Sequence, residues 1–167
     1  MTTDVLFAVR NGIGHITLNR PQALNALNLP MIRAIHAQLK AWAQDSAVKL
    51  VLIRGAGEKA FCAGGDVKSL YEGYQAGKRD HLTFFTEEYA LNHYTWVYPM
   101  PYVALMDGIC MGGGMGLAQP AKLRIATERT RVAMPETAIG LFPDVGGSHF
   151  MHRAPDELAA YLGLTGH

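Results

Sequence analysis

Two glycine-rich segments contain the residues whose spacing most clearly suggests chemistry. Residues 112–114 are three consecutive glycines that follow the apolar run Tyr102–Met106, and Ala63, Gly64 and Gly65 form a second run of small residues. Glycine has no Cβ, so a ligand oxygen can approach its amide closely, and a helix start adds positive partial charge. One amide from each segment would suit a developing oxyanion, and two tight structural turns are the alternative.

Three carboxylates are candidates for acid–base work. Glu136 and Asp144 each follow a proline, and the residues between them are uncharged and mostly apolar. Apolar surroundings disfavour the charged form of a carboxylate, so its pKa rises toward the range of a general acid or base. The alternative is that each carboxylate only caps a turn or helix. Glu88 lies beside Glu87 in a helical pattern, where a solvated helix face is the simplest interpretation.

Other common chemistries find little support in the residue pattern. Cys62 and Cys110 lie in small-residue segments without a marked histidine partner, which disfavours a cysteine nucleophile. His149 and His152 are three residues apart but lack flanking ligands, so we expect no metal site. The glycine segments match neither a phosphate-binding P-loop nor a dinucleotide fingerprint.

Length and composition indicate one domain with a sizeable core, because 49% of the 167 residues are hydrophobic. The net charge of +1 gives no electrostatic reason to expect nucleic acid. No apolar run approaches the roughly 20 residues needed to cross a bilayer, and we expect no membrane partner. The first residues resemble neither a secretory signal nor a transit peptide, and two cysteines make no disulfide framework. These features predict a cytoplasmic protein.

The elements that position the candidate residues alternate between strands and helices. Asn28 and Pro30 predict the start of a helix that ends near Asp45, with apolar residues at helical spacing. The predicted strands are residues 5–10, 15–18, 50–53, 102–106, 123–126 and 132–134, and the other predicted helices include residues 67–74 and 82–98. This alternation predicts the α/β class.

Four motifs in order resemble the crotonase (enoyl-CoA hydratase/isomerase) superfamily, and especially its branch that hydrolyses 3-hydroxyacyl-CoA thioesters. The motifs occupy residues 19–27, 61–66, 112–114 and 134–147, so the resemblance covers nearly the whole chain. It implies an α/β, crotonase-like spiral of repeated ββα units, with residues 1–167 as an N-terminal core that lacks the usual C-terminal helical part. It also implies an oligomer, or pairing with a missing C-terminal segment.

The resemblance implies a role for each candidate residue. The amides of Gly65 and Gly113 correspond to the oxyanion hole of the family, and Glu136 and Asp144 to catalytic acids. Glu88 corresponds to a substrate-binding acid. The implied substrate is an acyl-CoA, with coenzyme A present only as part of that substrate and no separate cofactor. The residues implied to contact it are Ala23, Leu27, Ala63, Gly64 and Asp66.

The residue two positions after the glycine triplet separates the reactions of the family. Hydratases usually carry a second glutamate there, whereas this chain has Gly116. The resemblance therefore favours hydrolysis of a short-chain 3-hydroxyacyl-CoA, with a place in valine catabolism. Enoyl-CoA hydration or isomerisation and a non-catalytic CoA-binding fragment remain the alternatives.

Overall fold

The first two strands form a hairpin because Asn11 and Gly12 both adopt positive φ, at 52° and 77°, as a tight two-residue turn requires. β1 (Val5–Arg10) and β2 (Ile13–Leu18) pair in antiparallel register around this turn. The computed structural model describes residues 3–166. Because the turn needs only Asn11 and Gly12, the strand predicted for residues 15–18 begins two residues earlier, at Ile13.

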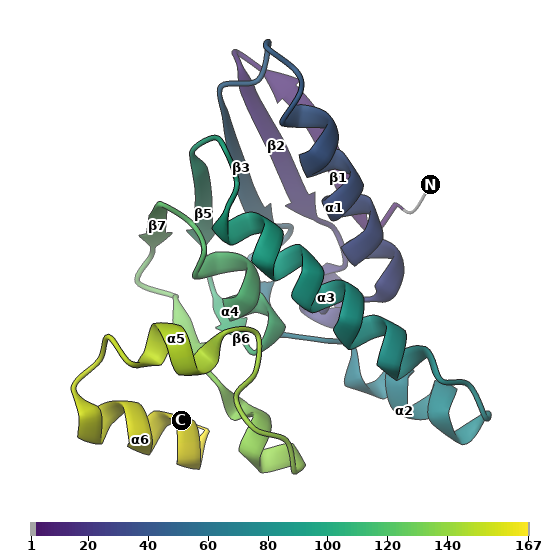
Figure 1. Cartoon of the computed structure of the whole chain (residues 1–167), viewed down its shortest axis with the longest axis vertical. Coiled ribbons are helices and arrows are strands. Elements are labelled where there is room, and N and C mark those ends of the chain that lie inside the picture. Colours follow the sequence, from purple (N-terminus) through teal and green to yellow (C-terminus); the bar gives the residue numbers. More distant parts are fainter. Residues whose placement is uncertain (1–2, 167) are drawn as a thin grey trace.

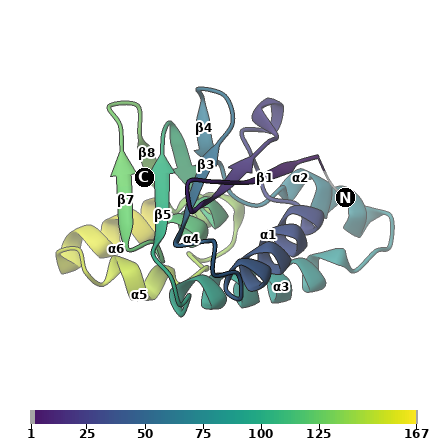
Figure 2. The same cartoon turned by 90° about the horizontal axis from the view of Figure 1, so that it is seen from above.

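The larger sheet of the described residues has five strands in the order β1-β2-β3-β5-β7. β3 (Leu50–Gly55), β5 (Tyr102–Met106) and β7 (Leu123–Ala126) continue parallel to β2. Helices lie along one face of this sheet (Figures 1 and 2). Gly14 in β2 leaves room for one of them, since a Cβ there would lie 2.8 Å from the Trp42 ring.

The helix α1 (Leu29–Trp42) begins where the sequence predicts. Oδ1 of Asn28 accepts a 2.9 Å hydrogen bond from the amide of Met31, which caps the first turn. The buried side chains of α1 recur at helical spacing and form its contact with the core: Met31, Ile32, Ile35, Leu39 and Trp42. α3 (Asp80–Trp96) packs against α1 and carries residues 80–96 across the molecule (Figure 1).

A smaller sheet brings the glycine segments together. β4 (Ala60–Cys62), β6 (Ile109–Met111) and β8 (Arg131–Ala133) are parallel, with β6 in the middle. Neither β4 nor β6 is among the strands predicted from the sequence, and β6 is a three-residue strand that lies between β5 and the glycine triplet. Because β4 and β6 are parallel neighbours, the segments that follow them leave from the same edge of this sheet.

Short helical elements complete the described chain. They are the 3-10 turns η1 (Pro21–Ala23) and η2 (Pro135–Ile139) and the helices α2 (Val67–Gln75), α4 (Gly113–Ala118), α5 (Gly147–Met151) and α6 (Asp156–Thr165). None of the helices within residues 3–166 is long and apolar enough to cross a membrane. The predicted α/β class is confirmed by this arrangement.

Candidate active site

The two glycine segments lie against each other, as the parallel pairing of β4 and β6 requires. A Cβ built on Gly64 would lie 3.6 Å from the amide nitrogen of Gly113, and one built on Gly113 would lie 3.4 Å from the amide nitrogen of Gly65. Gly64 and Gly112 have φ of 113° and 50°, a backbone region that residues other than glycine rarely adopt. Glycine is therefore needed here both for the backbone conformation and for the close approach.

The amides of Gly65 and Gly113 are left available by the local structure. In the bridge between Leu27 and Gly65, the Leu27 amide donates to Gly64 and the Asp66 amide donates to Leu27, so the Gly65 amide takes no part. Gly113 is the first residue of α4, where amides have no acceptor within the helix. These two donors are consequently free to bind an oxygen atom from a ligand.

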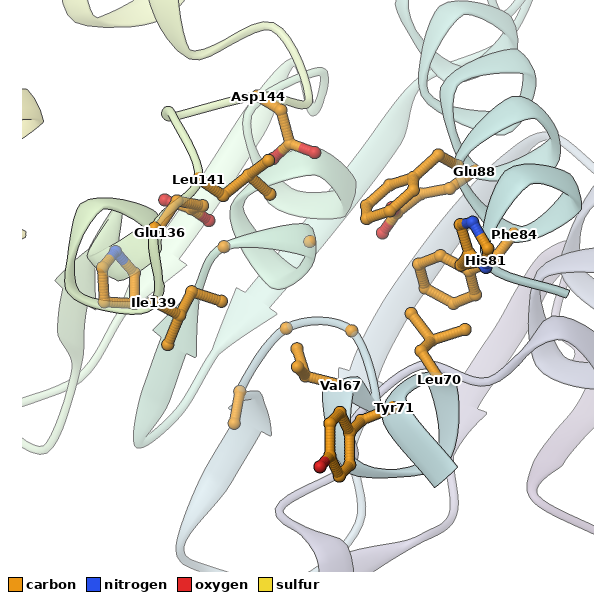
Figure 3. Close-up of a pocket in the computed structure, with 18 of the residues that line it drawn as sticks. Val67, Leu70, Tyr71, His81, Phe84, Glu88, Glu136, Ile139, Leu141 and Asp144 are labelled. Atoms are coloured by element: carbon orange, nitrogen blue, oxygen red, sulfur yellow. The ribbon is translucent and has the colours of Figure 1, made fainter. Parts of the chain in front are cut away.

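Three carboxylates from separate elements face the same cavity, which has a volume of about 460 Å³. Glu88 comes from α3, Glu136 from η2 and Asp144 from the loop after it, and Figure 3 shows Glu136 and Asp144 across the cavity from Glu88. Oε1 of Glu136 lies 2.7 Å from the Cβ position of Gly112, and a Cβ on Gly113 would collide with Oε1 of Glu88. Glu88 and Glu136 thus lie directly beside the glycine triplet.

Burial shifts the protonation of all three acids in the same direction. Burial raises the pKa of Glu88 to about 8, helped by repulsion from the charges of Asp144 and Glu136. Burial also raises the pKa of Glu136. A hydrogen bond from its own backbone amide lowers this pKa in part, and the charge of Asp144 raises it further. The pKa of Asp144 is raised by burial against the lowering effect of a hydrogen bond from Tyr89. Glu88 is therefore protonated at neutral pH, so it can donate a hydrogen bond.

Two carboxylate oxygens have no protein partner among the described residues. Oε1 of Glu88 and Oε2 of Glu136 are both buried and unpaired. Buried polar atoms in native proteins nearly always have a partner, so unpaired ones beside a cavity indicate a ligand or water. The walls around them are largely apolar and include Val67, Leu70, Phe84, Ile139 and Leu141 (Figure 3).

The residues expected to contact coenzyme A divide into two groups. Ala63 and Gly64 line the cavity. Ala23 and Leu27 lie outside the cavity lining. Ala23 belongs to η1, and Leu27 is fully buried, with its Cδ1 3.5 Å from the Cβ position of Gly113. Asp66 also lies outside the cavity lining, and its predicted role, like those of the other two, stays a prediction.

The carboxylate of Asp66 is occupied by structural contacts. It accepts a 2.8 Å hydrogen bond from Arg20 and caps α2 by accepting from the amide of Ser69 at 3.1 Å. Burial alone would raise its pKa, but these partners hold the pKa of Asp66 below its ordinary value. The side chain therefore stabilises the loop that carries Gly65.

Three polar side chains near the cavity were not singled out from the sequence. Tyr89 is 40% exposed and donates a 2.6 Å hydrogen bond to Oδ2 of Asp144. His81 lines the cavity, and its Nδ1 is buried without a partner among the described residues. Asn92 is buried one helical turn after Glu88. Spacing along α3 was the available signal, since residues 81, 85, 88, 89 and 92 share one side of a helix.

Neither cysteine nor metal chemistry finds support in this site. Burial raises the pKa of the Cys62 thiol to about 12 and also raises the pKa of Cys110, so both are protonated at neutral pH. Within residues 3–166, no group of three or more histidine, cysteine, aspartate or glutamate side chains is arranged to hold a metal ion.

Comparison with protein families and curated proteins gives consistent matches. Residues 13–167 match a family model described as enoyl-CoA hydratase/isomerase. The 3-hydroxyisobutyryl-CoA hydrolase of Danio rerio, named as mitochondrial, is 55% identical over 98% of this chain, and the human protein of that name is 52% identical over 98%. The chain spans 43% and 42% of these two proteins, less than half of their length.

Solved structures share the fold at high similarity. A carnitinyl-CoA dehydratase from Mycobacterium thermoresistibile superposes with a TM-score of 0.94 at 45% identity, over 99% of this chain and 48% of that one. An enoyl-CoA hydratase from Rhodobacter sphaeroides 2.4.1 gives a TM-score of 0.94 at 46% identity, over 99% and 49%.

The prediction of a cytoplasmic location is wrong by the comparison with curated proteins, because the relatives are named as mitochondrial. Free, buried cysteines and a near-neutral net charge are compatible with any reducing compartment. Composition therefore does not distinguish one such compartment from another.

Proposed function

Because this chain belongs to the enoyl-CoA hydratase/isomerase family, we propose that it carries the active site of an acyl-CoA thioester hydrolase. The proposed substrate is a short-chain 3-hydroxyacyl-CoA such as 3-hydroxyisobutyryl-CoA, the substrate in the names of the curated relatives. The observation that carries the proposal is the placement of two free glycine amides, Gly65 and Gly113, beside three carboxylates in one cavity. Coenzyme A enters as part of the substrate, and a role in valine catabolism follows from that substrate.

The thioester oxygen binds between the amides of Gly65 and Gly113. Charge develops on this oxygen when the carbonyl carbon is attacked, and amides already in position stabilise it without reorganisation. Removal of one such donor typically costs about 10²–10³ in rate. The close approach of the two loops supports this role, since a Cβ on Gly113 would lie 3.4 Å from the amide nitrogen of Gly65.

Glu136 carries the attack, in one of two ways. As a general base it takes a proton from water, whose oxygen bonds to the carbonyl carbon while the bond from that carbon to sulfur breaks. As a nucleophile its carboxylate oxygen bonds to the acyl carbon, the bond from that carbon to sulfur breaks and the thiolate leaves, and water then cleaves the resulting anhydride. In either case one water proton ends on the thiolate of coenzyme A, and Asp144 is placed to shuttle it. The unpaired Oε2 of Glu136 supports both routes.

Glu88 binds the hydroxyl group of the substrate. Its carboxyl is protonated at neutral pH and has an unpaired Oε1 inside the cavity, so it can both donate to and accept from a hydroxyl group. The remaining proposed contacts to coenzyme A are the backbone groups of Ala63 and Gly64 and the segments around Ala23, Leu27 and Asp66.

Association with a second copy, or with a further C-terminal segment, is part of the proposal. The strands β7 and β8 expose large apolar side chains, with Leu123 at 55%, Ile125 at 42% and Val132 at 50%. Exposed apolar clusters of this kind are typical of surfaces that another polypeptide covers.

Hydration of an enoyl-CoA is the second candidate, because one similar structure is named as an enoyl-CoA hydratase. The surroundings of Gly116 argue against it. A Cβ at this position would lie 2.8 Å from Cβ of Val145 and 2.9 Å from Nδ2 of Asn92, so no acidic side chain fits there without rearrangement. Syn addition of water to a double bond needs a pair of acids, which favours hydrolysis here.

A pair of assays separates the candidates. The purified chain is incubated with 3-hydroxyisobutyryl-CoA, and release of free coenzyme A thiol is followed with a thiol reagent. A parallel incubation with an enoyl-CoA follows loss of the conjugated double bond. Thiol release without double-bond loss supports the hydrolase, the reverse supports the hydratase, and binding of coenzyme A without either reaction supports a non-catalytic binding role. Glu136→Gln is the control for contaminating activity.

A further inference from the structure

A second cavity adjoins the candidate active site at Asp144. Its volume is about 470 Å³, and it is lined by residues of α3, of the loop 142–146 and of the start of α5. The first cavity uses α3 residues between His81 and Glu88, and the second uses those between Tyr89 and Trp96, so the two follow each other along this helix. Asp144 lines both cavities and is therefore the junction between them.

Asn92 forms the polar floor of this second cavity. Its side chain is 5% exposed, and neither Oδ1 nor Nδ2 has a hydrogen-bond partner within the described part of the chain. A side-chain amide offers two donors and an acceptor with two lone pairs, and buried groups of this kind are normally satisfied by protein or by ordered water. With no partner among residues 3–166, the Asn92 amide is left for a ligand or water in this cavity to satisfy.

The rim of the second cavity is open to solvent. His93, Phe142, Gly146 and Ser148 line it and are exposed, whereas Val145 and Gly147 are buried below them. A water molecule occupies about 30 Å³ in the liquid, so the cavity has room for several. Water can therefore reach Asp144 from this side without passing through the first cavity.

We propose that the second cavity is a water site, in which Asn92 holds ordered water and Asp144 receives the water that hydrolysis consumes. The inference rests on the proposed hydrolase function, because acyl-CoA then fills the first cavity and blocks it to solvent. An acyl tail in the second cavity would leave both amide atoms of Asn92 unpaired, which argues for water as the occupant. The water oxygen bonds to the acyl carbon, that carbon loses its bond to sulfur, and a water proton passes to the sulfur.

The occupant is tested first by crystallography, which does not depend on activity. High-resolution structures of the full chain are compared for the wild type and Asn92→Leu. We expect ordered water within hydrogen-bond distance of the Asn92 amide and of Asp144 in the wild type, and its loss in the variant. The substitution replaces an unpaired amide with an apolar side chain of similar size, so the fold should be kept. A second cavity without ordered water at Asn92 would overturn the proposal.

The delivery role is tested by kinetics with a matched pair of variants. Ser148→Phe fills the rim of the second cavity, and Ser46→Phe places the same side chain at an exposed position in the loop before β3, away from both cavities. We expect kcat to fall about tenfold in Ser148→Phe and in Asn92→Leu, the size of one lost hydrogen bond, with KM unchanged for acyl groups of every length. Ser46→Phe should match the wild type.

The other outcomes separate this inference from the proposed function. A rise in KM confined to longer acyl groups would identify an acyl pocket and overturn the water site. An active wild type with unaffected Ser148→Phe and Asn92→Leu would overturn the water route alone. A wild type without thioesterase activity would overturn the proposed function, and the delivery role with it, whatever the crystals contain.

Discussion

The phenol of Tyr89 donates a 2.6 Å hydrogen bond to Oδ2 of Asp144, which joins α3 to the loop that follows η2. This bond opposes the effect of burial on Asp144, since burial raises the pKa of that carboxyl and the phenol lowers it. Burial and the same bond raise the pKa of Tyr89, so the phenol keeps its proton at neutral pH. Tyr89 thus positions Asp144 and favours its charged form.

Tyr89→Phe should shift the pH dependence of hydrolysis. Without the phenol, the pKa of Asp144 rises further, so the acid limb of the kcat profile moves to higher pH. We expect kcat near neutral pH to fall about 10–100-fold, the effect of one hydrogen bond to a charged group. Tyr94→Phe, on the same helix, is the matched control and should keep the wild-type profile. An unshifted acid limb in Tyr89→Phe would remove the positioning role.

Glu136→Gln should abolish measurable hydrolysis and preserve binding. The amide keeps the shape of the side chain but neither accepts the water proton nor attacks the thioester, and loss of a general base typically costs about 10²–10⁴ in rate. Calorimetric titration with coenzyme A should give a dissociation constant close to that of the wild type. Turnover of the variant at the wild-type rate would exclude Glu136 as the general base or nucleophile.

Gly113→Pro tests the amide itself, with Gly113→Ala as its control. Proline lacks the N–H, and the first position of a helix accepts proline, so α4 should form. Both variants add a Cβ that collides with Oε1 of Glu88, and they differ in the amide hydrogen. We expect the proline variant to be about 10²–10³ slower than the alanine variant, measured as kcat with 3-hydroxyisobutyryl-CoA. Equal rates for the two would mean that this amide does not bind the oxyanion.

Glu88 should make the protein less stable as the pH rises. Its pKa is about 8 in the fold and about 4.5 for an unperturbed glutamate, so between these values the folded chain keeps a proton that the unfolded chain releases. The free energy of unfolding should then fall by up to about 1.4 kcal/mol per pH unit across this window. Glu88→Gln should flatten this dependence in urea titrations at pH 5, 6.5 and 8.

Glu87→Gln is the matched control for that experiment. Glu87 is the neighbour of Glu88 on α3, but it pairs with Arg33 at 2.7 Å on the surface, and this hydrogen bond lowers its pKa. Its substitution should leave the pH trend of the wild type unchanged. If Glu88→Gln retained the full trend as well, the buried proton would belong to another group.

The sequence was sufficient where local rules decide the structure. Asn28 before Pro30 marks a helix start because both residues favour it without tertiary help, and α1 begins there. The turn at Asn11 and Gly12 is equally local. The α/β class followed from the alternation of such elements, and family resemblance supplied the candidate site.

The rest depended on contacts between distant segments. The three-residue strand β6 is too short for a periodic pattern and exists through pairing with β4 and β8. The hydrogen bond from Arg20 to Asp66 joins residues 46 positions apart in the sequence. The local pattern around either residue does not predict this contact. The hydrogen bond from Tyr89 to Asp144 likewise joins α3 to a loop 55 residues away in the sequence.

The groups of the candidate site are spread along the chain from Gly65 to Asp144, in segments joined only by tertiary pairing. No single peptide excised from one of these segments would bring the amides and acids together. In a refolding experiment, catalysis should consequently reappear later than the helical circular-dichroism signal, with the arrival of the last loop.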